Sequence, residues 1–199
     1  VSTERLHTCA YMKITGSSDV RIKVLKSVEA HPKHPAVTTA PPPGQEGSLA
    51  QARPADQACL CEAVSELEGY FRFHSVLSKH DREFITIVVL RKASARYAWA
   101  RHEQRAILDG VPAEVVEQIR MEAPTDAIPV AYRDMTEFAR ALAYSKEELP
   151  QALFDRMVKT KGERWVLDAI GLVAHYSLVA TTIHGFGVRA RDDVDGRTF

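Results

Sequence analysis

The sequence has no excess of charge of either sign. Its 199 residues include 26 Lys and Arg and 26 Asp and Glu, so the formal net charge is zero. Proteins that hold nucleic acid or an anionic membrane surface by electrostatic attraction need a basic patch or a polybasic run, and the sequence contains neither. We therefore expect no nucleic-acid partner and no membrane partner.

Long apolar runs are also missing. The longest weakly charged apolar stretch covers residues 169–183, which is shorter than the roughly 20 residues that span a bilayer, and it contains His175. Its length and composition predict a buried core helix. Because residues 1–20 have scattered polar side chains and lack the apolar core of a signal peptide, we expect a cytoplasmic protein.

Cysteine is scarce, with only Cys9, Cys59 and Cys61. An odd number of cysteines without a secretory signal favours reduced thiols. The Cys59-x-Cys61 spacing is not that of a redox Cys-x-x-Cys motif, and zinc would need further ligands nearby. We interpret these two residues as free thiols on or near a helix.

Motifs for cofactors are absent as well. The sequence has no glycine-rich phosphate loop and no His-x-x-x-His or Glu-x-x-His pair with supporting ligands. His175 and His184 are nine residues apart, so on one helix they would not share a face. His74 and His80 flank a predicted loop, and we interpret them as structural. We expect no metal and no cofactor.

Residues 1–55 differ from the rest of the chain. They have few periodic apolar positions and contain the run Pro41-Pro42-Pro43-Gly44, which favours irregular backbone because proline removes an N–H donor. We predict an irregular N-terminal arm over residues 1–55, a helical domain over 56–188 and a polar tail over 189–199.

From residue 56 onward the apolar positions recur with helical spacing. Leu60, Val64, Leu67 and Phe71 are four, three and four residues apart, which places them on one helix face. Similar patterns, with Gly110 and Gly162 as stops, predict further helices over about 94–109, 112–121, 132–142, 149–158 and 163–184, the last closed by Gly185 and Gly187. The sequence therefore predicts an all-α fold.

One segment has two interpretations. Residues 84–90 read FITIVVL, a β-branched run that by propensity alone would form a buried strand. Ser78 followed by Asp81 resembles a capping box, and an alanine-rich stretch follows over residues 91–100, so both flanks favour a helix. We predict a helix here, with a strand as the alternative.

Glu83 stands at the start of this apolar segment, and His102 lies in the next predicted helix. An inward-facing carboxylate is costly to bury unpaired, and a histidine is a natural partner. Burial and a cationic neighbour shift a carboxyl pKa in opposite directions, so such a pair is tunable for proton transfer. The alternative is that Glu83 caps the helix N-terminus and His102 lies on the surface between Arg101 and Glu103.

Several motifs resemble those of one family. They are Arg82-Glu83 at the helix start, Tyr97-x-Trp99-Ala100-x-His102 in the next helix, Asp109-Gly110-Val111-Pro112 after it, and GLVAHY and HGFGV at 171–176 and 184–188. Together they cover about residues 60–188. In this combination the chain resembles the carboxymuconolactone decarboxylase and alkylhydroperoxidase D-like family.

The peroxidase branch of that family carries the pattern Glu-x11-Cys-x2-Cys-x3-His. Glu83 and His102 match its two ends because they are nineteen positions apart, whereas the two cysteine positions are occupied by Ala95 and Ala98. A peroxidase of this kind needs one thiolate to attack the peroxide and a second thiol to resolve it. The comparison therefore predicts that this site has no peroxidase activity.

The resemblance implies an alkylhydroperoxidase D-like helical fold with a central antiparallel helix hairpin. It also implies a homo-oligomer, commonly a trimer or hexamer. The decarboxylase branch, a lyase chemistry, requires proton placement and stabilisation of negative charge rather than thiols. Glu83 and His102 are then the catalytic acid/base couple, with Tyr97 as a third catalytic residue that donates a proton or a hydrogen bond.

Four further residues are candidates for substrate binding. Arg101 and Arg105 could pair with a substrate carboxylate, since a guanidinium matches its geometry; the alternative is that both are solvated. Trp99, like Tyr97, is either a pocket aromatic or a core aromatic. His175 is either a pocket residue or a core histidine.

These residues predict a cofactor-free enzyme that performs acid/base chemistry on a small organic acid or lactone, by decarboxylation or isomerisation. The alternative is a non-catalytic oligomeric binding or scaffold protein whose site was lost together with the cysteines. A third interpretation is a thiol-dependent antioxidant protein acting through Cys59 and Cys61.

Overall fold

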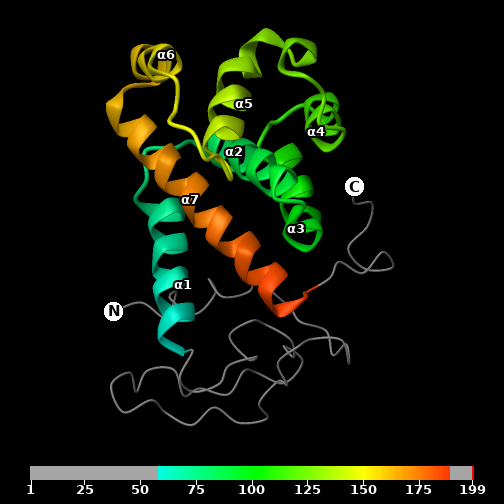
Figure 1. Cartoon of the computed structure of the whole chain (residues 1–199), viewed down its shortest axis with the longest axis vertical. Coiled ribbons are helices and arrows are strands. Elements are labelled where there is room, and N and C mark those ends of the chain that lie inside the picture. Colours follow the sequence, from blue (N-terminus) through cyan, green and yellow to red (C-terminus); the bar gives the residue numbers. More distant parts are fainter. Residues whose placement is uncertain (1–57, 189–198) are drawn as a thin grey trace. The chain divides into compact units, whose positions relative to one another are not determined.

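The computed structural model describes residues 58–188 and Phe199, and within them the chain is all helical, as predicted. Figure 1 shows the helices in chain order. Their bounds are α1 Ala58–Phe73, α2 Lys79–Lys92, α3 Arg96–Leu108, α4 Ala113–Arg120, the 3-10 turn η5 Thr125–Ala127, α5 Val130–Leu142, α6 Gln151–Lys161 and α7 Glu163–Phe186. The predicted N-terminal arm lies outside the described residues, and of the predicted tail only Phe199 is described.

The described residues belong to two compact units. Residues 58–70 and 186–188 fall in the first, and residues 71–185 and Phe199 fall in the second. All of the candidate site residues except the cysteines are therefore within the second unit, and the cysteines of α1 are in the first.

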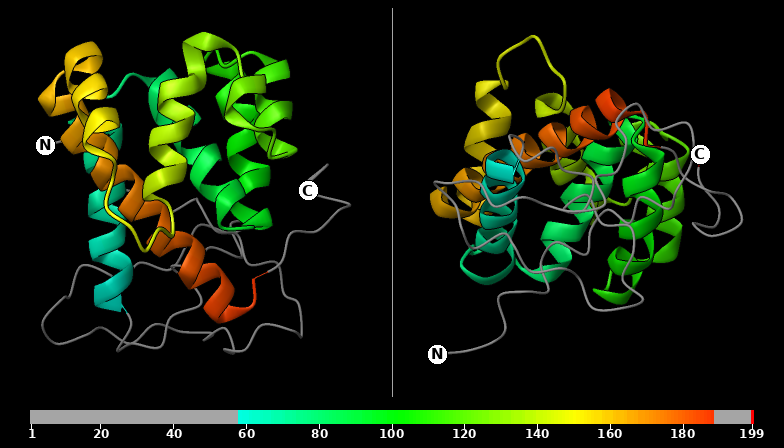
Figure 2. Two further views of the ribbon diagram at one scale, coloured as in Figure 1. Left: turned by 45° about the horizontal axis from the view of Figure 1, so that its top comes forward. Right: turned by 90° about the horizontal axis from the view of Figure 1, so that it is seen from below.

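Helix α2 covers the segment that could have been a strand. Its N-cap is Ser78, which has extended backbone and accepts a hydrogen bond from the Asp81 N–H at 3.0 Å, so the predicted cap is present. Helices α3, α4 and α5 all contact α2, and Figure 2 shows them beside it. Every residue from Glu83 to Leu90 is buried. A helix buried on all sides needs no polar stripe, which explains why its sequence lacks helical periodicity.

The turn between α2 and α3 is closed by two backbone hydrogen bonds. The N–H of Ser94 binds the carbonyl of Arg91 at 3.0 Å, and the N–H of Ala95 binds the carbonyl of Leu90 at 2.9 Å. These are the paired bonds of a Schellman motif, in which the residue after the C-cap takes a left-handed conformation. Ser94 does so with φ +54°, a position where glycine is usual. The turn brings α3 back against α2.

Helix α7 is longer than predicted at its end. The helix was expected to end at about His184 and to be closed by Gly185 and Gly187, but Gly185 is helical and Phe186 is the last helical residue. Gly187, with φ +70°, takes the left-handed conformation instead. A single glycine inside a helix costs only about 1 kcal/mol relative to alanine, so it does not by itself end the helix.

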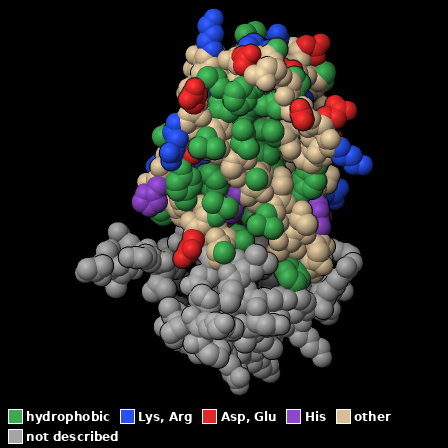
Figure 3. All heavy atoms as spheres, turned by 60° about the vertical axis from the view of Figure 1, so that its left-hand side comes forward, with side chains coloured by type: hydrophobic (Ala, Val, Ile, Leu, Met, Phe, Trp, Pro, Cys, Tyr) green, Lys and Arg blue, Asp and Glu red, His purple; other side chains and the backbone are tan. Residues whose placement is uncertain are grey.

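By length and composition alone, α7 could cross a membrane, but 50 % of its most apolar window is buried within the protein. Core helices of soluble proteins share these properties. Hydrophobic side chains are gathered on the face that Figure 3 shows. Exposed large apolar residues of α7 include Leu167, Ile170 and Leu178, whose spacing places them on one side of the helix.

Candidate functional site

The buried pair Glu83 and His102 joins α2 to α3. The Oε2 atom of Glu83 lies 2.7 Å from Nδ1 of His102, within hydrogen-bonding distance. Glu83 is 4 % exposed and His102 is 0 % exposed. The structure therefore contradicts the alternative that His102 lies on the surface, and it shows the two residues paired, as the resemblance to the family pattern implied.

The carboxylate determines which nitrogen of His102 carries the proton. An ionised Glu83 can only accept, so Nδ1 donates and the lone pair of a neutral ring is on Nε2. Arg82 Nε also lies 3.4 Å from the other oxygen, Oε1 of Glu83. The glutamate thus holds the imidazole in one orientation and stabilises the imidazolium that forms when Nε2 takes a proton.

Aromatic residues of α7 pack against the pair. The ring of Tyr176 meets His102 edge-on with 5.0 Å between ring centroids, and His175 meets Tyr176 at the same distance. Tyr176 is 3 % and His175 2 % exposed. The predicted residue His175 therefore contacts Tyr176, which lies between it and His102 in this series of ring contacts. Tyr176 was not among the predicted site residues, although it directly follows His175 in the motif GLVAHY at 171–176.

Arg105 lies one turn beyond His102 on α3. Burial lowers the pKa of its guanidinium, and electrostatic interaction with Tyr176 and Asp109 opposes that shift. The half-buried guanidinium therefore lies near the tyrosine that packs against His102.

Arg101 and Tyr97 contact each other on α3. The guanidinium carbon of Arg101 lies 4.2 Å above the centre of the Tyr97 ring, and Tyr97 is buried. This is a cation–π contact between residues one turn apart on α3. Both residues therefore have a role within the helix that requires no substrate.

Trp99 is part of the core between α3 and α4. It is fully buried, and its indole N–H donates to Oε2 of Glu103 at 3.2 Å. Glu103 in turn pairs with Arg120 of α4. The predicted role of Trp99 in substrate binding gains no support from these contacts, which account for its indole N–H.

The two positions where the resembling peroxidases have cysteine are small and buried. Ala95 is 0 % and Ala98 is 4 % exposed. Side chains of Cys59 and Cys61 are outside the described part of the chain, so a thiol-dependent role stays a prediction. Among the described residues, no group of three or more His, Cys, Asp and Glu side chains is placed to hold a metal ion.

Comparison with protein-family models, with curated proteins and with solved structures finds no match for this chain. The resemblance to the carboxymuconolactone decarboxylase family therefore rests on the motifs quoted above. The antiparallel helix hairpin, the oligomer and the cytoplasmic location stay predictions.

Proposed function

We propose that this protein is a cofactor-free enzyme that uses Glu83 and His102 for acid/base chemistry on a small organic acid or lactone, with decarboxylation as the reaction. The observation that carries the proposal is the 2.7 Å contact between the two buried side chains. A buried, hydrogen-bonded carboxylate–histidine pair is the usual structure of a tuned acid/base couple.

In this proposal each residue has one role. Loss of carbon dioxide from a carboxylated lactone breaks a carbon–carbon bond and leaves the electron pair on the lactone framework. His102, protonated and held by Glu83, then delivers a proton to carbon. Arg105 pairs with the negative charge before and during that step. Tyr176, whose ring contacts His102, excludes water from the proton transfer.

The burial of the pair means that a substrate needs a way in. His102 is 0 % exposed, so a substrate reaches it only when a covering side chain moves. The ring of Tyr176 packs directly against the imidazole, and we propose that its displacement lets substrate in. Tyr176→Ala should therefore lower the KM for a bulky carboxylated lactone, and an unchanged or raised KM would mean that the substrate enters elsewhere.

The proposal is tested by incubating the full chain with a panel of carboxylated γ-lactones and measuring carbon dioxide release. Glu83→Gln and His102→Ala should each lower turnover by about 10²-fold, the usual scale of acid–base catalysis. Glu148→Gln and His74→Gln change exposed residues of the same types and serve as matched controls. Near-wild-type turnover in both site variants would contradict the acid/base role.

One observation favours a second candidate function. The site that the family uses for chemistry is sealed here, with His102 and Ala95 both 0 % exposed. A non-catalytic binding or scaffold protein could also retain the two residues, because their hydrogen bond would stabilise the packing of α2 against α3. In that case wild-type protein releases no carbon dioxide from any lactone, while both site variants are less stable.

A further inference from the structure

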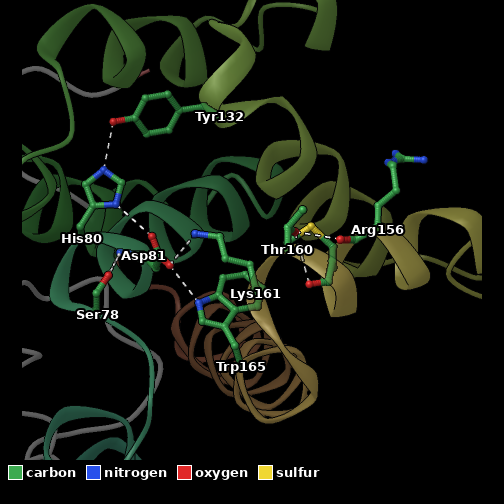
Figure 4. Close-up of polar contacts among 9 residues, drawn as sticks. Ser78, His80, Asp81, Tyr132, Arg156, Thr160, Lys161 and Trp165 are labelled. Atoms are coloured by element: carbon green, nitrogen blue, oxygen red, sulfur yellow. Dashed lines mark hydrogen bonds and ion pairs between the residues drawn. The ribbon is translucent and has the colours of Figure 1, made fainter.

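A second carboxylate–histidine pair lies at the start of α2. The carboxylate of Asp81 accepts three hydrogen bonds: from Nδ1 of His80 at 3.0 Å, from Nζ of Lys161 at 3.0 Å and from Nε1 of Trp165 at 2.9 Å. Figure 4 shows these groups around Asp81. In a capping box this side chain would reach back to its own helix, but here it binds residues of α6 and α7.

These hydrogen bonds keep Asp81 ionised. Burial by itself raises the pKa of the carboxyl group, but the hydrogen bonds from His80, Lys161 and Trp165, together with the charge of Lys161, outweigh it and leave the pKa below its ordinary value. An ionised Asp81 only accepts, so Nδ1 of His80 carries a proton and the lone pair of the neutral ring is on Nε2.

That nitrogen faces a phenol. The Nε2 atom of His80 lies 3.0 Å from the hydroxyl of Tyr132 on α5, as Figure 4 shows. The ring of Tyr132 packs against Phe84 with 5.0 Å between centroids, which fixes its direction. Hydroxyl, imidazole and carboxylate are therefore in line, in the order in which an activated hydroxyl, its base and the base's orienting group occur in catalytic triads.

The local field suits a negative charge. Asp81, Tyr132 and Trp165 are each the third residue of their helices α2, α5 and α7, so the amino ends of three helices meet at this cluster. Helix amino ends carry a partial positive charge. The N–H groups of Asp81 and Tyr132 already donate to Oγ of Ser78 and to the carbonyl of Pro129, so the stabilisation comes from that partial charge. An oxyanion that forms beside Tyr132 would be stabilised there.

The cluster is also open to solvent. The His80 side chain is 30 % exposed and Tyr132 is partly exposed. On the α3 side the neighbour is Gly110, where an added Cβ would lie 3.8 Å from Cδ2 of His80. A Cβ atom at that position would be in ordinary van der Waals contact with the imidazole.

We propose that Tyr132 is a nucleophilic hydroxyl that accepts an acyl group from an activated ester, with His80 as its base and Asp81 as the residue that positions His80. The phenol oxygen attacks the ester carbonyl while its proton passes to Nε2 of His80. The carbon–oxygen bond to the leaving alcohol breaks, and that alcohol takes the proton. Water, deprotonated by His80, then attacks the acyl-tyrosine ester, releasing the acid and restoring the phenol.

The cluster suits acyl transfer better than phosphoryl transfer. Transfer of a phosphoryl group needs several cationic groups or a metal ion around three charged oxygens. Lys161 is a cation that contacts this cluster, and its ammonium group is already paired with Asp81. An acyl group develops only one oxyanion, which matches the partial charge of helix amino ends.

Tyr132 needs His80 for this reaction. Burial, and after it the charges of Asp81 and Glu114, raise the pKa of the phenol above its ordinary value, so it does not ionise by itself near neutral pH. The reaction therefore depends on general-base assistance, which typically contributes about 10²–10⁴-fold.

The test is to treat the native full chain with p-nitrophenyl acetate at neutral pH and to locate acetyl groups by mass spectrometry at early times. Tyr132 should be acetylated at least about tenfold faster than Tyr144, and His80→Gln should slow its acetylation about 10²-fold. Tyr144 is a matched control because it is exposed and its hydroxyl binds Ser177 and not a histidine. Tyr132→Phe, which keeps the ring against Phe84, should remove the fast adduct.

Equal acetylation of Tyr132 and Tyr144, or acetylation of lysines alone, would overturn the proposal. So would an unchanged rate in His80→Gln. For Asp81→Asn the readout is the 15N spectrum of His80, in which the proton should move from Nδ1 to Nε2 as Tyr132 acetylation slows. A merely loosened fold would slow the reaction without reversing the tautomer, and that result would contradict the positioning role of Asp81.

Discussion

The two carboxylate–histidine pairs of α2 differ mainly in their exposure to water. Asp81 and Glu83 are two residues apart, about 200° around the helix, so they face nearly opposite sides. Glu83 and His102 are sealed in the core, whereas the side chain of His80 is 30 % exposed beside Asp81. The same chemical pair therefore has different surroundings in the two places: Glu83 lies 2.7 Å from His102 and 3.4 Å from Arg82, whereas Asp81 accepts hydrogen bonds from His80, Lys161 and Trp165.

The largest difference should appear when the histidine is removed from each pair. His102→Ala leaves the Glu83 carboxylate buried without its imidazole and should lower the free energy of unfolding by about 3 kcal/mol or more. His80→Ala leaves Asp81 with Lys161 and Trp165 and should cost less than about 1 kcal/mol. Urea denaturation of both variants measures this. Equal losses would mean that burial does not distinguish the two pairs.

A glycine supports the open pair from the backbone. Gly162 has φ +90° and ψ 155°, a conformation that other residues rarely adopt, and it lies between Lys161 and Trp165. Gly162→Ala should lower the free energy of unfolding by roughly 1–3 kcal/mol through strain. Gly69→Ala is the control, because Gly69 is helical with open space around its Cβ position and should gain about 0.5–1 kcal/mol. Thermal denaturation measures both changes, and a change in stability of the same sign in the two variants would contradict the strain at Gly162.

The open pair should also give stability a pH dependence in the acid range. The pKa of Asp81 is lowered in the folded protein, so the ionised form stabilises the fold above the ordinary value of 3.8. That contribution is lost as the pH falls through 3.8 toward the folded pKa. The wild type should therefore have a larger free energy of unfolding than Asp81→Asn at pH 7, and this difference should become smaller below pH 3.8. Chemical denaturation across this range measures it, and a difference that widened in acid would contradict the sign.

The smallest effect should come from the turn that sets α2 against α3. Ser94 adopts φ +54°, which costs a non-glycine residue about 1–2 kcal/mol, partly offset by the greater unfolded-state freedom of glycine. Ser94→Gly should therefore raise the free energy of unfolding by roughly 0.5 kcal/mol. Differential scanning calorimetry would show a small rise in Tm, and a fall would mean that the serine side chain itself stabilises the turn.

Local features of the sequence predicted much of the fold. The cap at Ser78 and the alanine-rich flank identified residues 79–92 as helix against their β propensity. Gly110 and Gly162 mark the ends of helices as expected. The end of α7 was misplaced because two nearby glycines gave the same signal, and only the backbone geometry selects Gly187.

The sealed pair was predicted from the resemblance to a family pattern, because Glu83 and His102 occupy its two ends on consecutive helices. The open cluster was not predicted, since Tyr132 and His80 are 52 residues apart and Asp81 and Trp165 are 84 apart. Their contacts depend on how three helix amino ends meet, and no local pattern encodes that. His80 was accordingly interpreted as structural from its position beside a loop.

The central claim is that the Glu83 carboxylate holds His102 with its proton on Nδ1. Long-range 15N–1H NMR of the histidine side chains in the full chain tests it most directly, with Glu83→Gln as the comparison. The account predicts a protonated Nδ1 for His102 in the wild type and a changed 15N shift in Glu83→Gln. A wild-type spectrum with the proton of His102 on Nε2 alone, unchanged in Glu83→Gln, would contradict it.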